Sequence, residues 1–147
     1  MALEVRKIES SEYERVAEVV NSSFQHLAVQ YQSLKGIATF TQYSSSGAIA
    51  ERDLAGATTY VALIQNIIIG MLQVSDGNHI AMLFVLPELQ SRGVGRALVK
   101  GADAQSGLKT VNASVNSVMA YMRYGFMPCG ADQVAPDGIR FVPMKRS

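Results

Sequence analysis

Apolar and polar residues change their spacing along the chain, and this change separates helical segments from strands. In residues 3–8, apolar and charged side chains partly alternate, which predicts a first β-strand. An apolar stripe at helical spacing then predicts a helix over residues 12–20, with Ser11 and Glu14 as its capping box. The chain therefore starts with a strand followed by an amphipathic helix.

The segment after this helix is less regular. Aromatic and aliphatic residues at helical spacing predict a second helix over residues 24–34, which Gly36 would end. Residues 39–56 are ambiguous, because "SSSG" favours a loop whereas "AIAERDLA" favours a short helix.

Strand patterns begin at residue 58. Residues 58–63 and 67–74 are rich in β-branched and aliphatic side chains and flank a two-residue turn. The turn "SDGN" then leads to residues 79–86, which are apolar throughout. This third strand is expected to be central in a sheet, and Pro87 ends it.

Helix and strand patterns alternate again in the last third of the chain. After Gly93, a helix is expected whose buried face comprises Val94, Ala97, Leu98, Gly101 and Ala102. A strand over 109–115, a helix over 116–124 closed by Gly125, and strands near 126–129 and 139–144 joined by "APDG" complete the chain. This order predicts one mixed α/β domain over residues 1–147, with a mixed (α+β) sheet of about seven strands, about four helices and a parallel crossover.

Composition narrows the class of protein. The chain has 147 residues and a net charge of +1, which fits a single globular core and argues against nucleic-acid binding. No apolar run is long enough for a membrane helix, and the N-terminus lacks the apolar core of a signal peptide. Cys129 is the single cysteine, so no internal disulfide is expected. These features fit a cytoplasmic protein.

The stretch "ELQSRGVGRALV", residues 88–99, places a glycine-rich turn at the start of a predicted helix. Its first turn carries Arg92 and Arg96 and no acidic residue, although helix N-termini favour negative charge. Free N–H groups beside Gly93 and Gly95 would converge on an anion such as phosphate. The plainer alternative is that the two glycines only permit a tight turn and close packing.

Three classes of phosphate site use such a turn, and the residues around Gly95 separate them. A Walker A loop needs Lys and then Ser or Thr after its last glycine, where this chain has Arg96 and Ala97. A dinucleotide site needs Gly or Ala where the chain has Leu98, and an acidic residue at the next strand end is missing. The third pattern, Gln or Arg-x-x-Gly-x-Gly or Ala after a strand, matches residues 90–95.

Residues 90–95, "QSRGVG", and residues 112–126, "NASVNSVMAYMRYGF", together resemble the GCN5-related N-acetyltransferase (GNAT) superfamily. The second run is similar to the family's later motif, N-x-x-A-x-x-F-Y-x-x-x-G-F, and the order of elements is similar over nearly the whole chain. The resemblance implies one GNAT domain and an acyltransferase without a metal. It would transfer an acetyl group from acetyl-CoA to an amine acceptor of unknown identity. A homodimer formed through C-terminal strands is compatible with the resemblance.

The resemblance also implies a cofactor site. The strand ending at Phe84 and Val85 would splay from the parallel strand over 110–113, and the backbones of these two residues would hold the pantetheine arm. The pyrophosphate would lie on the turn formed by Gln90, Ser91, Arg92, Gly93, Val94, Gly95, Arg96 and Ala97. For the two arginine side chains, the alternative is a solvated helix face. Asn116 would contact the cofactor, or cap the last helix, or do both.

The resemblance implies catalytic roles as well. The Val85 N–H would donate to the thioester oxygen, and Tyr121 would protonate the departing thiolate, since a phenol with a pKa near 10 is protonated at neutral pH. The alternative for Tyr121 is that it packs with Val118 on the buried face of the helix. Tyr124 is the second candidate acid. The acceptor would attack directly in a ternary complex.

No general base can be identified from the residues. Glu51, Asp53 and Glu88 are available acids, but none matches a position that the resemblance assigns. His79 lies about 20 Å along its strand from Val85, too far for direct proton transfer.

Five further residues and two rival mechanisms remain. By resemblance, the acceptor pocket is lined by the region that holds His26, Phe24, Tyr31, Phe40 and Tyr43, although aromatic residues at helical spacing are usually core. A covalent acetyl-cysteine mechanism would need Cys129, for which a buried apolar role is the expectation. The other rival is a CoA-binding sensor that transfers nothing.

Overall fold

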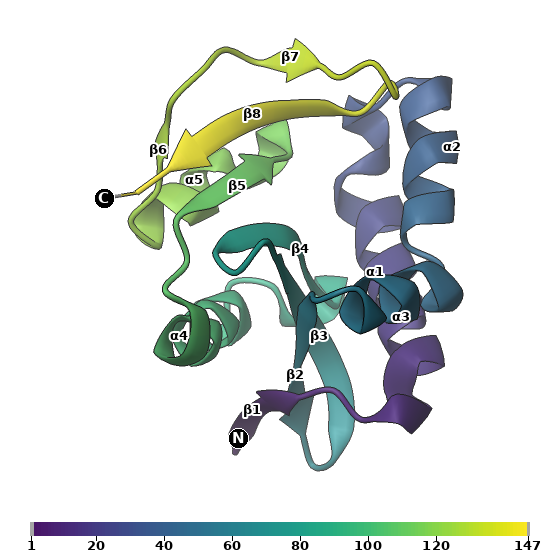
Figure 1. Ribbon diagram of the computed structural model, residues 1–147, viewed down its shortest axis with the longest axis vertical. Coiled ribbons are helices and arrows are strands. Elements are labelled where there is room, and N and C mark those ends of the chain that lie inside the picture. Colours follow the sequence, from purple (N-terminus) through teal and green to yellow (C-terminus); the bar gives the residue numbers. More distant parts are fainter. Residues whose placement is uncertain (1, 147) are drawn as a thin grey trace.

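A computed structural model describes residues 2–146 of the chain (Figure 1). Its strands are β1 (Leu3–Lys7), β2 (Thr58–Ile64), β3 (Ile67–Ser75), β4 (His79–Val85), β5 (Thr110–Ala113), β6 (Met127–Pro128), β7 (Gln133–Val134) and β8 (Arg140–Lys145). The α-helices are α1 (Tyr13–Leu27), α2 (Leu34–Tyr43), α3 (Ser46–Leu54), α4 (Val94–Ser106) and α5 (Val118–Arg123). Short 3-10 helices are η1 (Ser10–Glu12), η2 (Val29–Tyr31), η3 (Pro87–Leu89) and η4 (Val115–Ser117).

The strands form one mixed sheet in the order β1-β2-β3-β4-β5-β8-β6, and β7 adds to β8. Strands β1 to β4 are antiparallel neighbours, β4 and β5 are parallel, and α4 makes the crossover between them. Two of the expected turns are confirmed by left-handed residues, at Gln65 and Asn66 and again at Asp76 and Gly77. The mixed α/β sheet is thus confirmed, with β7 as a strand that the sequence pattern did not predict.

The sheet forks between β4 and β5. These strands pair only at His79 with Thr110 and at Ile80 with Val111. Beyond Ile80 they separate, and the two halves of the sheet diverge around an open space (Figure 1). The rest of β4 therefore has a partner on its β3 side only.

Helices cover both faces of the β1–β4 half. Helices α1 and α3 pack on one face and α4 packs on the other (Figure 1). The first core includes Val16, Val20 and Met71, and the second includes Leu98 and Phe126. No helix within residues 2–146 is long and apolar enough to cross a membrane.

The helix expected over residues 24–34 is wrong. Because the apolar stripe of α1 continues through Phe24, that helix runs on to Leu27, and a new helix begins at Leu34. Gly36 lies in the first turn of α2 rather than after a helix, and its N–H donates to the Ser33 side chain at 3.1 Å. Ser33 is thus the N-cap that the sequence analysis missed.

Two other helix boundaries also become clear. The expected capping pair of Ser11 and Glu14 is wrong, because the Glu9 N–H donates to the Glu12 side chain at 2.8 Å, two residues earlier. In the ambiguous segment, the short-helix alternative is confirmed as α3, whose first turn is capped by Ser45.

The turn between β7 and β8 docks on α2. The Lys35 ammonium donates to the Pro136 carbonyl at 2.9 Å, and the Thr39 hydroxyl donates to the Asp137 carbonyl at 2.6 Å. Gly36 and Gly138 lie against each other in this contact, since a Cβ on Gly36 would be 2.6 Å from the Gly138 carbonyl oxygen. We call this contact between residues 32–39 and 135–140 the hairpin clasp. It joins the two halves of the sheet at the end opposite the paired residues of the fork (Figure 1).

Candidate active site

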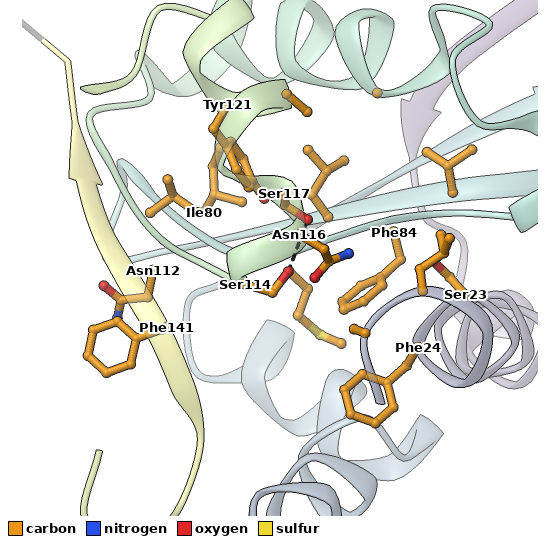
Figure 2. Close-up of a pocket in the computed structure, with 18 of the residues that line it drawn as sticks. Ser23, Phe24, Ile80, Phe84, Asn112, Ser114, Asn116, Ser117, Tyr121 and Phe141 are labelled. Atoms are coloured by element: carbon orange, nitrogen blue, oxygen red, sulfur yellow. Dashed lines mark hydrogen bonds between the residues drawn. The ribbon is translucent and has the colours of Figure 1, made fainter. Parts of the chain in front are cut away.

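A cavity of about 980 Å³ fills the fork. Its walls come from both halves of the sheet: β4 and the start of α4 on one side, β5, α5 and β8 on the other, with α1 and α2 at one end (Figure 2). The fold therefore brings the two sequence motifs, residues 90–95 and 112–126, to opposite walls of one cavity.

The unpaired edge of β4 presents backbone groups to this cavity. The Leu86 N–H donates to the Ile69 carbonyl at 2.9 Å, so the N–H of Leu86 points toward β3. Because hydrogen bonding alternates along an antiparallel strand, Phe84 also points its backbone toward β3, whereas Leu83 and Val85 point theirs into the fork. The backbone groups of β4 that face the fork are thus those of Leu83 and Val85, whereas the contact of the Phe84 backbone with the pantetheine arm stays a prediction that this direction does not favour. Phe84 instead lines the cavity with its ring (Figure 2).

Gln90 fixes one of the exposed groups of β4. Its side-chain amide donates to the Val85 carbonyl at 2.8 Å. The Val85 carbonyl is therefore engaged, while the Val85 N–H remains directed into the fork. The Gln90 side chain thus supports the end of β4, and its expected contact with the cofactor stays a prediction.

The turn before α4 has the backbone geometry of an anion site. Ser91 and Gly93 are both left-handed, with φ of 62° and 85°, and Gly93 is the N-cap of α4. The N–H groups of Val94, Gly95 and Arg96 belong to the first helical turn and have no acceptor within the helix. Ser91 and residues 93–96 line the cavity.

Two residues of the expected phosphate site, Ala97 and Arg92, do not line the cavity. The Ala97 N–H donates to the Gly93 carbonyl at 3.0 Å, so it closes the first helical turn and is not free for an anion. Arg92 is exposed and does not line the cavity, in contrast to Arg96. For the Arg92 side chain, the solvated-face alternative fits better.

Gly95 allows α5 to approach α4. A Cβ on Gly95 would lie 2.5 Å from the Tyr124 hydroxyl oxygen, which is closer than any real Cβ contact. The Arg96 guanidinium lies 5.8 Å from the centre of the Tyr124 ring. Burial raises the pKa of Tyr124, although Arg96 and Arg123 act in the opposite direction. The close-packing explanation for Gly95 is therefore correct, whereas the left-handed φ accounts for Gly93.

Tyr121 is buried in the core beneath α5 and still reaches the cavity. Its ring meets Tyr124 and Phe126 edge-on, with centroids 5.9 Å apart in each case. Its hydroxyl has no hydrogen-bond partner among the described residues. Every fully buried polar side-chain atom in this part of the chain does have a partner, so the Tyr121 hydroxyl must be accessible, and it opens to the cavity that Tyr121 lines. Burial raises the pKa of Tyr121 well above its usual value. The phenol is therefore a protonated donor at neutral and mildly alkaline pH.

Asn116 does not cap a helix. It lies within η4, whose N-cap is Ser114, and the N-cap of α5 is Ser117. The two serine hydroxyls are 3.0 Å apart, and the Asn116 amide points into the cavity (Figure 2). The capping alternative is therefore wrong, and the amide is free to meet a ligand.

Few titratable groups could act as a base here. Glu51, Asp53, Glu88 and His26 do not line the cavity, and among the described residues its lining carboxylate is that of Asp137. His79 lies at the paired end of the fork, where its Nδ1 is 2.8 Å from the Thr110 hydroxyl. Burial lowers the pKa of His79 and favours its neutral form.

The expected burial of Cys129 is wrong. Its side chain is exposed, because β6 lies at the edge of the sheet, and it does not line the cavity. Cavity residues that the sequence analysis missed include Asn112, Arg123 and Phe141. Arg123 is two positions after Tyr121 and could have been inferred from the motif, whereas Phe141 carries no signal of its own.

Comparisons with known proteins agree with this geometry. The chain matches the acetyltransferase (GNAT) domain family over residues 25–147. It is 27% identical over 139 residues to the N-acetyltransferase YafP of Escherichia coli, covering 95% of this chain and 91% of that protein. Its fold is similar to that of a GCN5-related N-acetyltransferase from Rhodopseudomonas palustris, with a TM-score of 0.83, 21% identity and coverage of 100% of this chain and 98% of that chain.

A second solved structure with a similar fold contains coenzyme A. It is the PaiA N-acetyltransferase of Thermoplasma acidophilum in complex with coenzyme A, with a TM-score of 0.77, 20% identity and full coverage of both chains. The family match spans most of the chain. The protein therefore belongs to the GNAT acetyltransferase family and is an acyltransferase.

Proposed function

We propose that the protein is an acetyl-CoA-dependent N-acetyltransferase that acetylates a primary amine by direct attack in a ternary complex. The observation that carries this proposal is the fork itself. The unpaired edge of β4 leads from the middle of the cavity to the left-handed turn at Gly93, with Tyr121 on the opposite wall.

The residues fit the chemistry of acetyl-CoA along its length. The pantetheine arm is a chain of amides, and it can pair with the N–H and C=O groups of Leu83 and the N–H of Val85 as an added strand would. The pyrophosphate matches the free N–H groups of residues 94–96. Nothing lies within 4 Å of an ideal Cβ on Gly93, so the space beside that turn is open for phosphate oxygens. Arg96, beside this turn, and Arg123, on the opposite wall, add positive charge to the cavity.

The chain's own groups can then serve the transfer. The amine nitrogen forms a bond to the thioester carbon while the carbon–sulfur bond breaks. The Val85 N–H donates to the carbonyl oxygen as it gains charge, which is worth about 3 kcal/mol for one such donor. Tyr121 gives its proton to the departing sulfur, and burial keeps that proton available at the pH of reaction.

Calorimetry with acetyl-CoA on two matched variants tests the cofactor site. Gly93→Glu and Gly107→Glu each place a carboxylate at a left-handed position of α4, one at the start of the helix and one at its end. Backbone strain is therefore similar, at about 1–2 kcal/mol each. We expect wild type and Gly107→Glu to bind acetyl-CoA with micromolar or tighter affinity and Gly93→Glu to lose binding while it remains folded by circular dichroism.

Equal binding by the two variants would contradict the proposed phosphate site. Tight acetyl-CoA binding without acetylation of any amine would favour the sensor alternative over transfer. Ping-pong kinetics together with an inactive Cys129→Ala variant would favour a covalent route, which the exposed position of Cys129 outside the cavity does not support.

A further inference from the structure

The end of the cavity formed by α1 and α2 is built from aromatic rings. The Phe24 and Phe40 rings stack with centroids 4.2 Å apart, and the Phe40 ring lies 5.5 Å from that of Phe84 and 6.3 Å from that of Tyr43. We call these four side chains the aromatic wall. They come from α1, α2 and β4, and all four line the cavity; Figure 2 shows Phe24 and Phe84.

This wall offers no partner for a second positive charge. The one lining carboxylate among residues 2–146 is Asp137, in the turn of the hairpin clasp. One of its carboxylate oxygens already accepts the Ile139 N–H at 3.1 Å. The carboxylate is thus partly engaged within its own turn, and a cationic group that packs on the rings would lose its hydration.

One face of the wall is already occupied by a cation. The Arg52 guanidinium lies 3.6 Å from the centre of the Tyr43 ring, and its Nε donates to the Gln73 side chain at 2.8 Å. Burial lowers the pKa of Arg52. The face of the Tyr43 ring is therefore occupied by Arg52 in a cation–π contact, and the positive charge of Arg52 further disfavours a cationic ligand beside it.

The hairpin clasp limits the size of what can lie against the aromatic wall. It ties the β7–β8 turn to α2 through Lys35 and Thr39, directly above the end of the cavity. Gln32 adds a pair of bonds, accepting from the Arg140 N–H at 2.8 Å and donating to the Arg140 carbonyl at 2.9 Å. Residues of the clasp, including Gln32, Asp137 and Arg140, line the same cavity as the aromatic wall.

From these contacts we infer that the acceptor is a small hydrophobic monoamine: a single primary amine on an aromatic or branched aliphatic body, without a second cation. This inference rests on the proposed function and specifies its substrate class. The rings would bury the apolar body of the acceptor, and the amine would project toward the fork, where Val85 and Tyr121 lie.

The same wall accounts for the missing general base. An ammonium that enters an apolar site loses hydration, which lowers its pKa and favours the neutral amine, with its proton released to solvent. The amine nitrogen then bonds to the carbonyl carbon, the carbon–sulfur bond breaks, and the sulfur takes the Tyr121 proton. The proton released from the new amide nitrogen passes through solvent back to the Tyr121 phenolate, so protons balance without a carboxylate.

A panel of four acceptors tests the inference on the wild-type protein. Release of the CoA thiol is measured with 2-phenylethylamine, 3-methylbutylamine, spermidine and a short lysine-containing peptide. We expect kcat/KM for each of the two hydrophobic amines to exceed that for spermidine and the peptide by about tenfold or more. A preference for spermidine or the peptide would overturn the inference.

Variants tie the preference to the wall. Phe40→Leu keeps an apolar side chain of similar length but removes the ring, whereas Tyr31→Leu removes a ring from η2 that does not line the cavity. We expect Phe40→Leu to raise KM for 2-phenylethylamine about fivefold and Tyr31→Leu to leave it unchanged, with acetyl-CoA affinity intact in both. Equal effects of the two variants would overturn the assignment of the wall.

The outcomes for the cofactor and the acceptor separate the two proposals. Loss of acetyl-CoA binding in the wild type would overturn the proposed function and this inference together. Acetyl-CoA binding with spermidine or the peptide as the better acceptor would overturn the substrate class alone.

Discussion

Two tyrosine hydroxyls lie near the end of α5, and their surroundings give them different tasks. Tyr124 is half-buried and directs its hydroxyl at Gly95, in the first turn of α4. Tyr121 is almost fully buried, and its hydroxyl opens to the cavity without a partner among the described residues. Tyr121 is therefore the stronger candidate for the acid.

Replacing Tyr121 with phenylalanine tests this assignment. We expect Tyr121→Phe to lower kcat about 100-fold, because the departing thiolate loses its proton donor, and to leave the acetyl-CoA dissociation constant unchanged. Tyr124→Phe, the matched control, should have a much smaller effect on kcat. The assignment would be reversed if Tyr124→Phe caused the larger loss.

The buried phenol also makes stability depend on alkaline pH. Burial raises the pKa of Tyr121 in the folded protein above the value near 10 of the unfolded chain. Below pH 10 both states hold the proton, and above it the unfolded chain releases the proton first. The free energy of unfolding should therefore fall above pH 10, by up to about 1.4 kcal/mol per pH unit from this group. Urea unfolding at pH 9 to 11 should show a shallower decline for Tyr121→Phe; parallel curves would contradict the account.

Single residues were predictable where their backbone geometry was specific. The phosphate turn was visible because glycines at 93 and 95 precede a helix with no acidic residue in its first turn. Asn116 was harder, because three polar residues within 114–117 can each cap a helix, and the choice depends on where η4 begins. The exposure of Cys129 depends on β6 being an edge strand, which a local pattern does not reveal.

Helices α4 and α5 meet through Gly95 and Tyr124, and this contact sets the position of α5 beside the phosphate turn. A double-mutant cycle measures it. Gly95→Ala alone should destabilise the protein, because the new methyl group would lie 2.5 Å from the Tyr124 hydroxyl oxygen. In the Tyr124→Phe background that oxygen is gone, and the ring carbon at 3.5 Å is an ordinary contact.

We therefore expect the same Gly95→Ala change to cost less in the Tyr124→Phe background, with a coupling free energy of about 1 kcal/mol. Thermal unfolding of the four proteins gives this value directly. Additive effects would mean that the hydroxyl is not the group that Gly95 accommodates.

Strands were easier to predict than helix boundaries. Residues 58–85 contain three apolar runs separated by turn residues, so a meander was the natural interpretation. The boundary between α1 and α2 was missed because apolar spacing continues across η2, and the break depends on the cap at Ser33. Strand β7 has two residues and exists only through its pairing with β8.

The hairpin clasp connects the two halves of the molecule, and paired glycine variants measure its contribution. Gly36→Ala would place a methyl group 2.6 Å from the Gly138 carbonyl oxygen, whereas Gly47→Ala, in the first turn of α3, would meet nothing within 4 Å. We expect Gly36→Ala to lower the free energy of unfolding by about 1–3 kcal/mol and Gly47→Ala to raise it by about 0.5–1 kcal/mol.

Kinetics should separate the clasp from the rest of the site. We expect Gly36→Ala to loosen the clasp and widen the space between α2 and β8. The KM for the acceptor should therefore rise, whereas acetyl-CoA affinity should be unchanged. A parallel loss of acetyl-CoA affinity would mean that the clasp supports the whole fork and does not act on the acceptor end alone.

Contacts between segments far apart in the sequence cannot be predicted from local patterns of residues. The fork was expected from the resemblance of two motifs, and its strands lie where those motifs placed them. The clasp pairs residues about 100 positions apart, such as Lys35 with Pro136, and nothing in either segment indicates its partner. The aromatic wall likewise combines α1, α2 and β4, and each ring alone fits a core position.

The unpaired edge of β4 has a consequence for how the protein avoids self-association. An open strand edge usually invites pairing with another chain and, with it, aggregation. Here the edge lies in the centre of the sheet, enclosed by α5 on one side and the clasp at the far end. A second polypeptide could therefore pair with this edge only from within the cavity. The fold thus keeps an unpaired strand edge accessible to a ligand inside the cavity while it limits strand pairing between copies of the protein.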